Sequence, residues 1–233
     1  MIPAYGRALI IGAGVGLSAS LARAFAGEGL RVGLAAGNTD KLSPLASEIG
    51  AAVHAADASQ PEAVEALFAA MDNALGGPPE VVVYNSSARV RGPLVELDAR
   101  AVSQAMAVTA YGGFLVAQAA ANRMLRAGQG AILFTGASAS VKGYPGSAPF
   151  AMGKFALRGL AQSIARELAP KGIHVAHVVI DGAIRNPGRD EPPDAPDSML
   201  DADAIARTYL HVLRQDRSAW TWEVELRPWV ERF

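Results

Sequence analysis

Lys154 could donate a proton to a substrate, directly or through water, because the pKa of a lysine falls readily when its amine is buried near a cation. Phe150 precedes it by four residues, so the two side chains would share one face of a helix. Hydroxyl groups that could donate a proton lie in the segment leading into this helix, at Ser138, Ser140, Tyr144 and Ser147. These residue types favour proton transfer to a small substrate, and the absence of cysteine excludes a thiolate nucleophile.

Three glycines, Gly12, Gly14 and Gly16, follow a short apolar run and precede a segment of helical period that begins at Leu17. Glycine permits a tight turn and lets a bound pyrophosphate approach the backbone, where free N–H groups at the start of a helix point toward it. This strand–turn–helix context predicts that the three glycines and Leu17 form part of a dinucleotide site. A tight turn without a ligand is the alternative.

Apolar runs of strand length alternate with segments of helical period along the chain. We expect strands at residues 7–11, 31–35, 52–56, 81–84, 131–135, 174–180 and 223–226. We expect helices at residues 17–28, 40–49, 61–75, 99–126, 148–168 and 201–215. Thr39 is expected to be the N-cap of the second helix, and Pro61 to occupy the first position of the third.

Several of these strands are apolar without interruption, which is typical of parallel strands buried on both faces. The alternation of strands and helices predicts right-handed βαβ crossovers. The prediction is therefore an α/β fold, a single Rossmann-type domain over residues 1–233 with a doubly wound parallel sheet.

Residues 186–198 are rich in proline and acidic side chains, a composition that excludes helix and strand. A segment of this length is more typical of a functional loop than of a plain connector. We expect a substrate loop at residues 185–199, with an exposed linker without a role as the alternative.

The chain has 233 residues, 51% of them apolar, and a formal net charge of −1 at pH 7. Lysine and arginine are scattered, which argues against a nucleic-acid surface or a polybasic membrane patch. The apolar run at residues 8–11 ends in glycine and is too short for a membrane span or a signal core. We expect a cytoplasmic protein that binds neither nucleic acid nor membrane. The histidines lack metal-ligand spacing, so no metal site is expected.

The chain resembles the short-chain dehydrogenase/reductase family over nearly its whole length. The first turn of that family usually reads T-G-x-x-x-G-x-G, and here Gly12 and Gly16 match while Ser18 replaces the last glycine. Asp57 matches the acid that meets the adenine ring in the family. A helix-capping role for Asp57, ahead of Pro61, is the alternative.

Three further positions carry the resemblance at the nucleotide site. Asn85 matches the asparagine of the family's N-A-G segment, although both following residues differ. Gly182 and Ile184 fall where the family usually has P-G ahead of the substrate loop, with Asp181 in place of the proline. The resemblance implies that Asn85, Gly182 and Ile184 contact the cofactor.

In this family a tyrosine donates the proton, and a lysine four residues later lowers its pKa and binds the nicotinamide ribose. A serine orients the carbonyl, and an asparagine holds a water relay to the lysine. The tyrosine position falls on Phe150 and the lysine position on Lys154. The serine position falls on Ala137, beside Ser138, and the asparagine position on Thr109. The resemblance implies a catalytic set in which only the lysine is kept.

Phe150 has no proton to give, and general acid catalysis typically contributes ~10²–10⁴-fold, so the usual mechanism would be severely slowed. Lys154 could donate the proton itself, directly or through water, and Tyr144 is another candidate donor. Ser138 would polarise the substrate and Lys154 would position the cofactor. A substrate that needs little proton assistance, such as an iminium or a conjugated alkene, would also tolerate Phe150.

The end of the second strand bears on the choice between NADP and NAD, because an acid there binds the ribose 2′-OH of NAD and an arginine accepts the 2′-phosphate of NADP. Ala36 and Gly37 occupy these positions. The cofactor is therefore NADP or NAD, with NADP favoured by the missing carboxylate although no cation holds its phosphate. Asn38 could contact either ribose.

The leading hypothesis is a divergent NAD(P)-dependent oxidoreductase that acts on a small organic carbonyl, alcohol or activated double bond. One alternative is a dinucleotide-binding sensor or scaffold without turnover, and another is non-redox chemistry on the same scaffold. The resemblance also implies a homodimer or homotetramer. The substrate pocket is expected to be lined by residues 89–93, 138–147 and 184–199.

Overall fold

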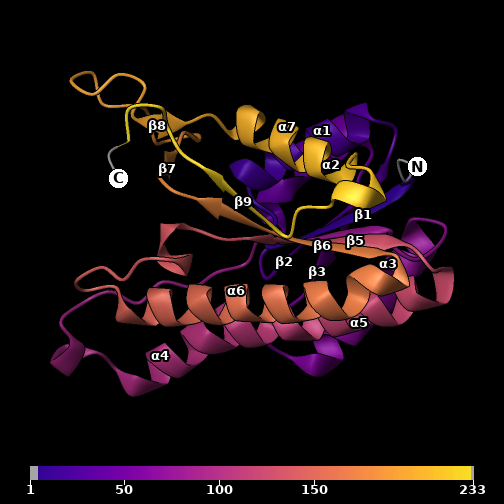
Figure 1. Ribbon diagram of the computed structural model, residues 1–233, viewed down its shortest axis with the longest axis horizontal. Coiled ribbons are helices and arrows are strands. Elements are labelled where there is room, and N and C mark those ends of the chain that lie inside the picture. Colours follow the sequence, from indigo (N-terminus) through magenta and orange to yellow (C-terminus); the bar gives the residue numbers. More distant parts are fainter. Residues whose placement is uncertain (1–4, 232–233) are drawn as a thin grey trace.

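The computed structural model describes residues 5–231 and has a parallel sheet at its centre (Figure 1). The sheet has seven strands in the order β3-β2-β1-β4-β5-β6-β9. The strands are β1 (Arg7–Ile11), β2 (Arg31–Ala36), β3 (Ala52–Ala55), β4 (Val81–Tyr84), β5 (Gly130–Thr135), β6 (Ile173–Ile180) and β9 (Glu223–Leu226). The predicted doubly wound α/β fold is confirmed, and each predicted strand lies within one residue of its observed bounds. Residues 1–4 and 232–233 of the predicted domain lie outside the described residues.

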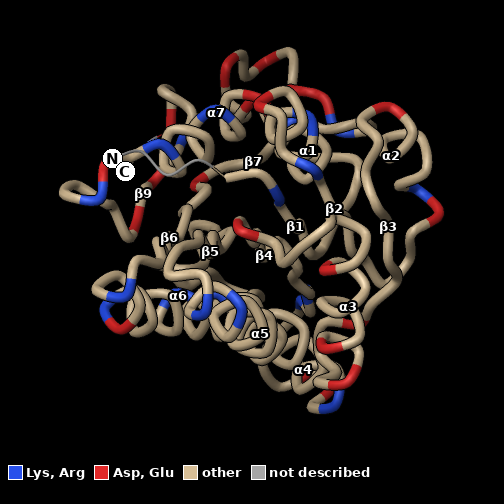
Figure 2. Tube along the Cα trace, turned by 90° about the vertical axis from the view of Figure 1, so that its right-hand side faces the viewer, with Lys and Arg blue, Asp and Glu red and all other residues tan. Residues whose placement is uncertain are grey.

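Helices cover both faces of the sheet (Figure 1). They are α1 (Leu17–Gly27), α2 (Ser43–Ile49), α3 (Pro61–Ala74), α4 (Ala99–Met106), α5 (Gly112–Ala127), α6 (Ala148–Leu168) and α7 (Ala202–Leu213). Alternate residues of a strand point to opposite faces, so Leu9 and Ile11 join the core under α3, α5 and α6, whereas Ala8 and Ile10 join the core under α1 and α7. The central strands β4, β5 and β6 carry no charged residue, and both signs are spread over the helices and loops outside them (Figure 2).

Two predicted helix starts need correction. Residues 40–42 form a 3-10 turn before α2, and the hydroxyl of Thr39 makes no capping hydrogen bond. Instead, the Oδ1 atom of Asn38 accepts a hydrogen bond from the Asp40 N–H at 2.8 Å. Asp201 is the N-cap of α7 rather than its first residue, since its side chain accepts from the Ala204 N–H. Pro61 does lie in the first turn of α3, as predicted.

The predicted helix 99–126 is continuous but contains a π-helical turn at Ala107–Tyr111, between α4 and α5. The hydroxyl of Tyr84, at the end of β4, donates to the Val108 carbonyl, which has left the regular α-helical pattern. Gly112 and Gly113 let the helix approach this tyrosine, because a Cβ on Gly112 would lie 2.5 Å from the Tyr84 hydroxyl oxygen. The π turn brings Thr109 beneath α6.

The segment between residues 185 and 198 is tied at both ends by a short parallel pair, β7 (Ala183–Ile184) and β8 (Met199–Leu200). Inside it the backbone is irregular except for an isolated bridge between Asn186 and Arg189, in agreement with the prediction. Within residues 5–231, no helix is long and apolar enough to cross a membrane.

Candidate active site

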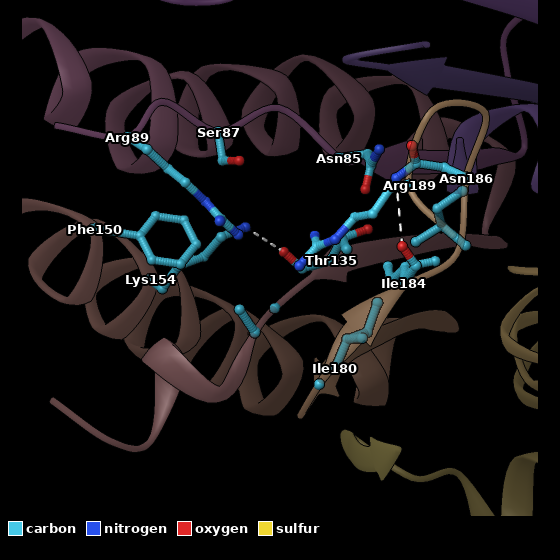
Figure 3. A pocket seen from close by; sticks show the side chains of 14 residues that line it. Asn85, Ser87, Arg89, Thr135, Phe150, Lys154, Ile180, Ile184, Asn186 and Arg189 are labelled. Carbon is cyan, nitrogen blue, oxygen red and sulfur yellow. Dashed lines mark hydrogen bonds between the residues drawn. The ribbon is translucent and has the colours of Figure 1, made fainter. Parts of the chain in front are cut away.

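A cavity of about 250 Å³ opens at the carboxyl ends of β4, β5 and β6, beside the glycine turn after β1 (Figure 3). Its walls are formed by Leu17, Asn85, Ser87, Arg89, Thr135, Gly136, Ala137, Phe150, Lys154, Ile180, Gly182, Ile184, Asn186 and Arg189. Ligands of open α/β sheets bind at this edge of the strands. The cavity therefore brings together six predicted site residues: Leu17, Asn85, Phe150, Lys154, Gly182 and Ile184.

Lys154 lies in the wall of the cavity with only 3% of its surface exposed. Its Nζ atom donates a hydrogen bond to the Thr135 carbonyl at the end of β5, at 2.7 Å. Burial, followed by the positive charge of Arg89, lowers the pKa of Lys154 to about 7. The amine can therefore both hold and release a proton at neutral pH.

Phe150 lies one helical turn before Lys154 and lines the same cavity. The Arg89 guanidinium covers the face of its ring, with the Cζ atom 4.3 Å from the ring centroid, and the Lys154 Nζ atom is 5.9 Å from that centroid. Burial lowers the pKa of Arg89, and the neighbouring charges of Arg91 and Arg189 lower it further. The position predicted for a proton donor thus holds an apolar ring that supports a cation.

Thr109, predicted to belong to the catalytic set, does not line the cavity. It is buried with 1% exposure, and its Oγ1 atom accepts a hydrogen bond from the Ala88 N–H at 3.0 Å. A Cβ on Gly153 would lie 2.9 Å from the Thr109 Cβ, so α6 packs directly on this side chain. Thr109 therefore fixes the loop that carries Arg89 against the helix that carries Lys154.

Ser138, predicted to polarise the substrate, does not line the cavity either, whereas its neighbour Ala137 does. Ser140, a candidate proton donor in the sequence, is fully buried. Its Oγ atom accepts from the Ala137 N–H at 3.1 Å and lies 3.3 Å from the His177 Nε2 atom. The serine next to the site is thus used to hold the cavity wall.

His177 continues this chain of hydrogen bonds. Its Nδ1 atom is 3.0 Å from a Glu223 carboxylate oxygen, and the Arg158 guanidinium binds both oxygens of Glu223 at 2.6 and 2.7 Å. Burial lowers the pKa of His177 to about 4, so the ring is neutral, and the carboxylate favours the proton on Nδ1. The Nε2 atom is then free to accept from the Ser140 hydroxyl. No signal in the sequence alone joins these residues, which come from separate elements.

The glycine turn after β1 is held against the end of β2. The Gly12 and Ala13 N–H groups both donate to the Ala35 carbonyl at 2.9 Å, and Gly12 has a φ of +81°, which favours glycine. No atom lies within 4 Å of a Cβ built on Gly14. Gly16 is the N-cap of α1 and makes no side-chain capping bond. The turn therefore leaves open space beside Gly14, while the Asn186 side chain lies against Gly16 at the start of α1.

Ser18, which replaces the family's third glycine, links two loops at this site. Its Oγ atom donates to the Gly12 carbonyl at 3.1 Å and accepts from the Asn85 side-chain amide at 2.7 Å. Asn85 thereby ties the loop after β4 to the turn after β1. Both residues order the site through side-chain contacts that a sequence pattern does not reveal.

Asn38 and Asp57 lie outside the cavity lining. The side chain of Asn38 holds the turn before α2, as described above, while Gly37 beside it faces open space. The Asp57 Oδ1 atom accepts from the Ser59 N–H at 2.9 Å and from the Ser59 hydroxyl at 2.7 Å. The N-cap of α3 is Gln60, so Asp57 shapes the turn before the helix and is not its cap.

Gly182 and Ile184 line the cavity. Gly182 has a φ of +153°, and a Cβ there would lie 2.8 Å from Leu200. Asp181 before it is buried, and its carboxylate pairs with the Lys142 amine at 2.9 Å. Asp181, which stands at the proline position of the family pattern, does not line the cavity and is neutralised by Lys142. It therefore adds no negative charge to the cavity wall.

The predicted pocket lining is partly correct. Arg89, Ile184, Asn186 and Arg189 line the cavity, whereas residues 90–93 and 138–147 do not. Ser87, Thr135 and Ile180 also line the cavity and were not among the predicted residues, although their places after or at the ends of β4, β5 and β6 are the signal that could have identified them. Within residues 5–231, no group of three His, Asp or Glu side chains could hold a metal ion.

Comparison with known proteins identifies the family. Residues 7–189 match the family model for short chain dehydrogenases. The chain belongs to the short-chain dehydrogenase family. The structure of a short-chain dehydrogenase from Rhodopseudomonas palustris is 38% identical, with a TM-score of 0.83 over 97% of this chain and 100% of that one.

Two further dehydrogenases resemble this chain. An alcohol dehydrogenase from Thermococcus sibiricus, solved in complex with 5-hydroxy-NADP, is 25% identical, with a TM-score of 0.86 over 97% of this chain and 98% of that one. Human 17-beta-hydroxysteroid dehydrogenase type 1 is 29% identical over 151 residues, which is 65% of this chain. The match spans only 44% of the human enzyme.

Proposed function

We propose that this chain is a divergent NAD(P)-dependent oxidoreductase that acts on a small organic carbonyl, alcohol or activated double bond. The observation that carries the proposal is Lys154, a buried amine with a pKa near neutrality in the wall of a cavity that adjoins a dinucleotide-type glycine turn. A buried lysine without a chemical or binding role is costly for a fold, because desolvation penalises its charge.

The residues around the cavity fit a nicotinamide dinucleotide. The open space before Gly14 and the uncapped start of α1 would accept the pyrophosphate, with Gly12, Gly16 and Leu17 forming the rest of the turn. Lys154 and Gly182 would bind the nicotinamide end, whereas Asn85 and Ile184 would contact the cofactor nearer the glycine turn. When bound, the cofactor would supply or accept the hydride.

NADP is favoured over NAD in this proposal. At the end of β2, Ala36 and Gly37 present no carboxylate that would repel a 2′-phosphate. The Thermococcus sibiricus relative was solved with an NADP derivative. Contacts of Asn38 with the ribose and of Asp57 with the adenine remain predictions of the family resemblance.

Lys154 is the proton donor or acceptor in the proposed reaction. Phe150 carries no exchangeable proton, and among the cavity-lining residues Lys154 is the one whose pKa lies near 7. Ser138 and Thr109 remain predictions of the family resemblance, and we give neither a direct part because neither lines the cavity. The loop at residues 185–199 contributes Asn186 and Arg189 to the cavity, which supports its assignment as the substrate loop.

A second reading, a dinucleotide-binding protein without turnover, is favoured by Phe150 alone. The two readings separate in one experiment. The purified protein is loaded with NADPH or NADH, and the absorbance of the reduced nicotinamide is followed with a panel of small aldehydes, ketones, imines and conjugated enones. The oxidoreductase reading predicts turnover that Lys154→Met reduces by at least ~10²-fold, whereas Lys171→Met, on the exposed turn after α6, leaves it unchanged. Tight binding without turnover across the panel would favour the second reading.

The expected homo-oligomer is part of the same proposal. Exposed apolar side chains on the π turn, α5 and α6, at Tyr111, Phe114, Leu125, Met152 and Phe155, support a surface that a second copy would cover. Size-exclusion chromatography with light scattering tests it, and a monomer at micromolar concentration would contradict it. A cytoplasmic location stays a prediction.

A further inference from the structure

We propose that the substrate carries an anionic group, a carboxylate or a phosphate, and that Arg89 binds this group at the Phe150 end of the cavity. The identification of the ligand as a substrate rests on the proposed function, but the binding of an anion at Arg89 can be tested without it.

The cavity carries a positive charge. Three of its lining residues, Arg89, Lys154 and Arg189, carry basic side chains, and none of its lining residues is acidic. The nearby Asp181 carboxylate is already paired with Lys142. Among residues 5–231, neither Arg89 nor Arg189 has a carboxylate within ion-pair distance, whereas seven of the other fourteen arginines have one. The cavity therefore has an uncompensated positive charge that an anionic ligand would neutralise.

The Arg89 side chain is held against Phe150. Its guanidinium lies on the face of Phe150, and stacking of this kind leaves the N–H groups at the edge of the guanidinium plane free. Those donors match two oxygens of one carboxylate or phosphate. The backbone of the same loop is fixed one residue earlier, where the Ala88 N–H donates to Thr109. Phe150, in the family position of the proton donor, thus serves as a support that orients an arginine.

The two possible sources of an anion, the substrate and the cofactor phosphates, would lie at different ends of the cavity. Arg189 enters the cavity from the loop beside Asn186, and its side chain reaches toward Thr135 (Figure 3). Asn186 is close to the glycine turn, since a Cβ on Gly16 would lie 3.4 Å from the Asn186 Cβ. Arg89 lies at the other end, over Phe150 and near Lys154 (Figure 3). A cofactor phosphate on the glycine turn would lie at the Asn186 end of the cavity, whereas Arg89 lies at the Phe150 end, beside the amine that exchanges the proton.

The test compares matched small probes by isothermal titration calorimetry. Acetoacetate and its neutral methyl ester are titrated into the protein saturated with oxidised cofactor, and inorganic phosphate serves as a second anion. Wild-type protein should bind acetoacetate at least ~10-fold more tightly than the ester, a preference of the size that a charge-assisted bidentate pair provides. Arg89→Met keeps the aliphatic stem on Phe150 and should reduce this preference to less than ~2-fold, with no change in cofactor affinity. Arg91→Met removes a charge from the same loop outside the cavity lining and should keep the preference.

Three results overturn the proposal: equal binding of acid and ester, a preference that survives in Arg89→Met, or an absence of Arg89-dependent binding of either anion at millimolar concentration. A loss of cofactor affinity in Arg89→Met with an unchanged acid preference also overturns it, by assigning Arg89 to the cofactor. Thermal melts confirm that both variants fold, and Arg89→Lys, which keeps the charge without the planar fork, should give an intermediate preference. If no cofactor binds to the wild type, the proposed function falls, and the same titrations on the cofactor-free protein still decide the anion site.

Discussion

The substitution Lys154→Met tests the electrostatics of the site through protein stability alone. Lys154 is buried, and its pKa in the folded protein is about 7, against an ordinary value of 10.5 that applies to the unfolded chain. Below about pH 7 the amine is charged in both states, so the folded protein bears the full cost of the buried charge. Above that pH the folded protein releases the proton while the unfolded chain keeps it, and the wild type becomes more stable relative to Lys154→Met.

The size of this effect follows from the pKa difference. One pKa unit corresponds to about 1.4 kcal/mol, so the two units between about pH 7 and pH 9 give a relative stabilisation of about 2–3 kcal/mol. Methionine has a similar length and no charge, so its own contribution does not change with pH. The rise would continue toward pH 10.5, where the unfolded chain also loses its proton.

The assay is urea unfolding followed by the fluorescence of the three tryptophans, for wild type and Lys154→Met, between about pH 6 and pH 9 and without cofactor. Groups that titrate equally in both proteins cancel in the difference between the two unfolding free energies. We expect that difference to shift by about 2–3 kcal/mol in favour of the wild type as the pH rises. A difference that stays flat within ~0.5 kcal/mol would refute the reasoning, because Lys154 would then remain charged at pH 9 and could not exchange a proton near neutrality.

Three further predictions concern the residues around Lys154. The double variant Phe150→Tyr with Ala137→Ser should raise carbonyl reductase activity by ~10²-fold or more, measured by nicotinamide absorbance, and no gain would mean that these two positions do not limit catalysis. Gly14→Ala should leave stability unchanged, because its methyl group meets no atom within 4 Å, but should weaken cofactor binding at least ~10-fold by filling that space. Gly27→Ala, which also places a methyl group in open space, is the matched control. Equal cofactor affinities of Gly14→Ala and wild type in calorimetry would contradict the site. Ser140→Ala should cost about 1–3 kcal/mol in urea unfolding, since the Ala137 N–H and the His177 Nε2 atom lose their partner, and a cost below ~0.5 kcal/mol would show that this network does not hold the wall.

The strands and most helix bounds could be predicted because they depend on local pattern. Runs such as Val81–Tyr84 are apolar throughout and lie in the sheet interior, and α6 has the predicted bounds Ala148–Leu168. The π turn at Ala107–Tyr111 could not be predicted, since it depends on the hydroxyl of Tyr84, which is distant in sequence, and on the close approach of Gly112. The hydrogen bond from the Asp40 N–H to the Asn38 side chain, where Thr39 makes no capping bond, could not be predicted because both residue types have side-chain oxygens and the backbone path decides between them.

The site could be predicted where spacing along one element decides it. Phe150 and Lys154 share a helix face, and the glycine turn follows its strand directly. The position of Arg89 on Phe150 could not be predicted, because it joins a loop after β4 to a helix more than fifty residues later. For the same reason the sequence did not reveal that Thr109 holds the Arg89 loop or that Ser140 pairs with His177.

A titration of the purified protein with NADPH and with NADH, followed by nicotinamide fluorescence, tests the central claim most directly. We expect micromolar binding of at least one of them, with NADPH the tighter, and a loss of at least ~10-fold in Lys154→Met because the ammonium at the nicotinamide end is removed. Absence of binding for both cofactors, in reduced and oxidised form, would contradict the account and leave a protein of short-chain dehydrogenase fold without a dinucleotide site.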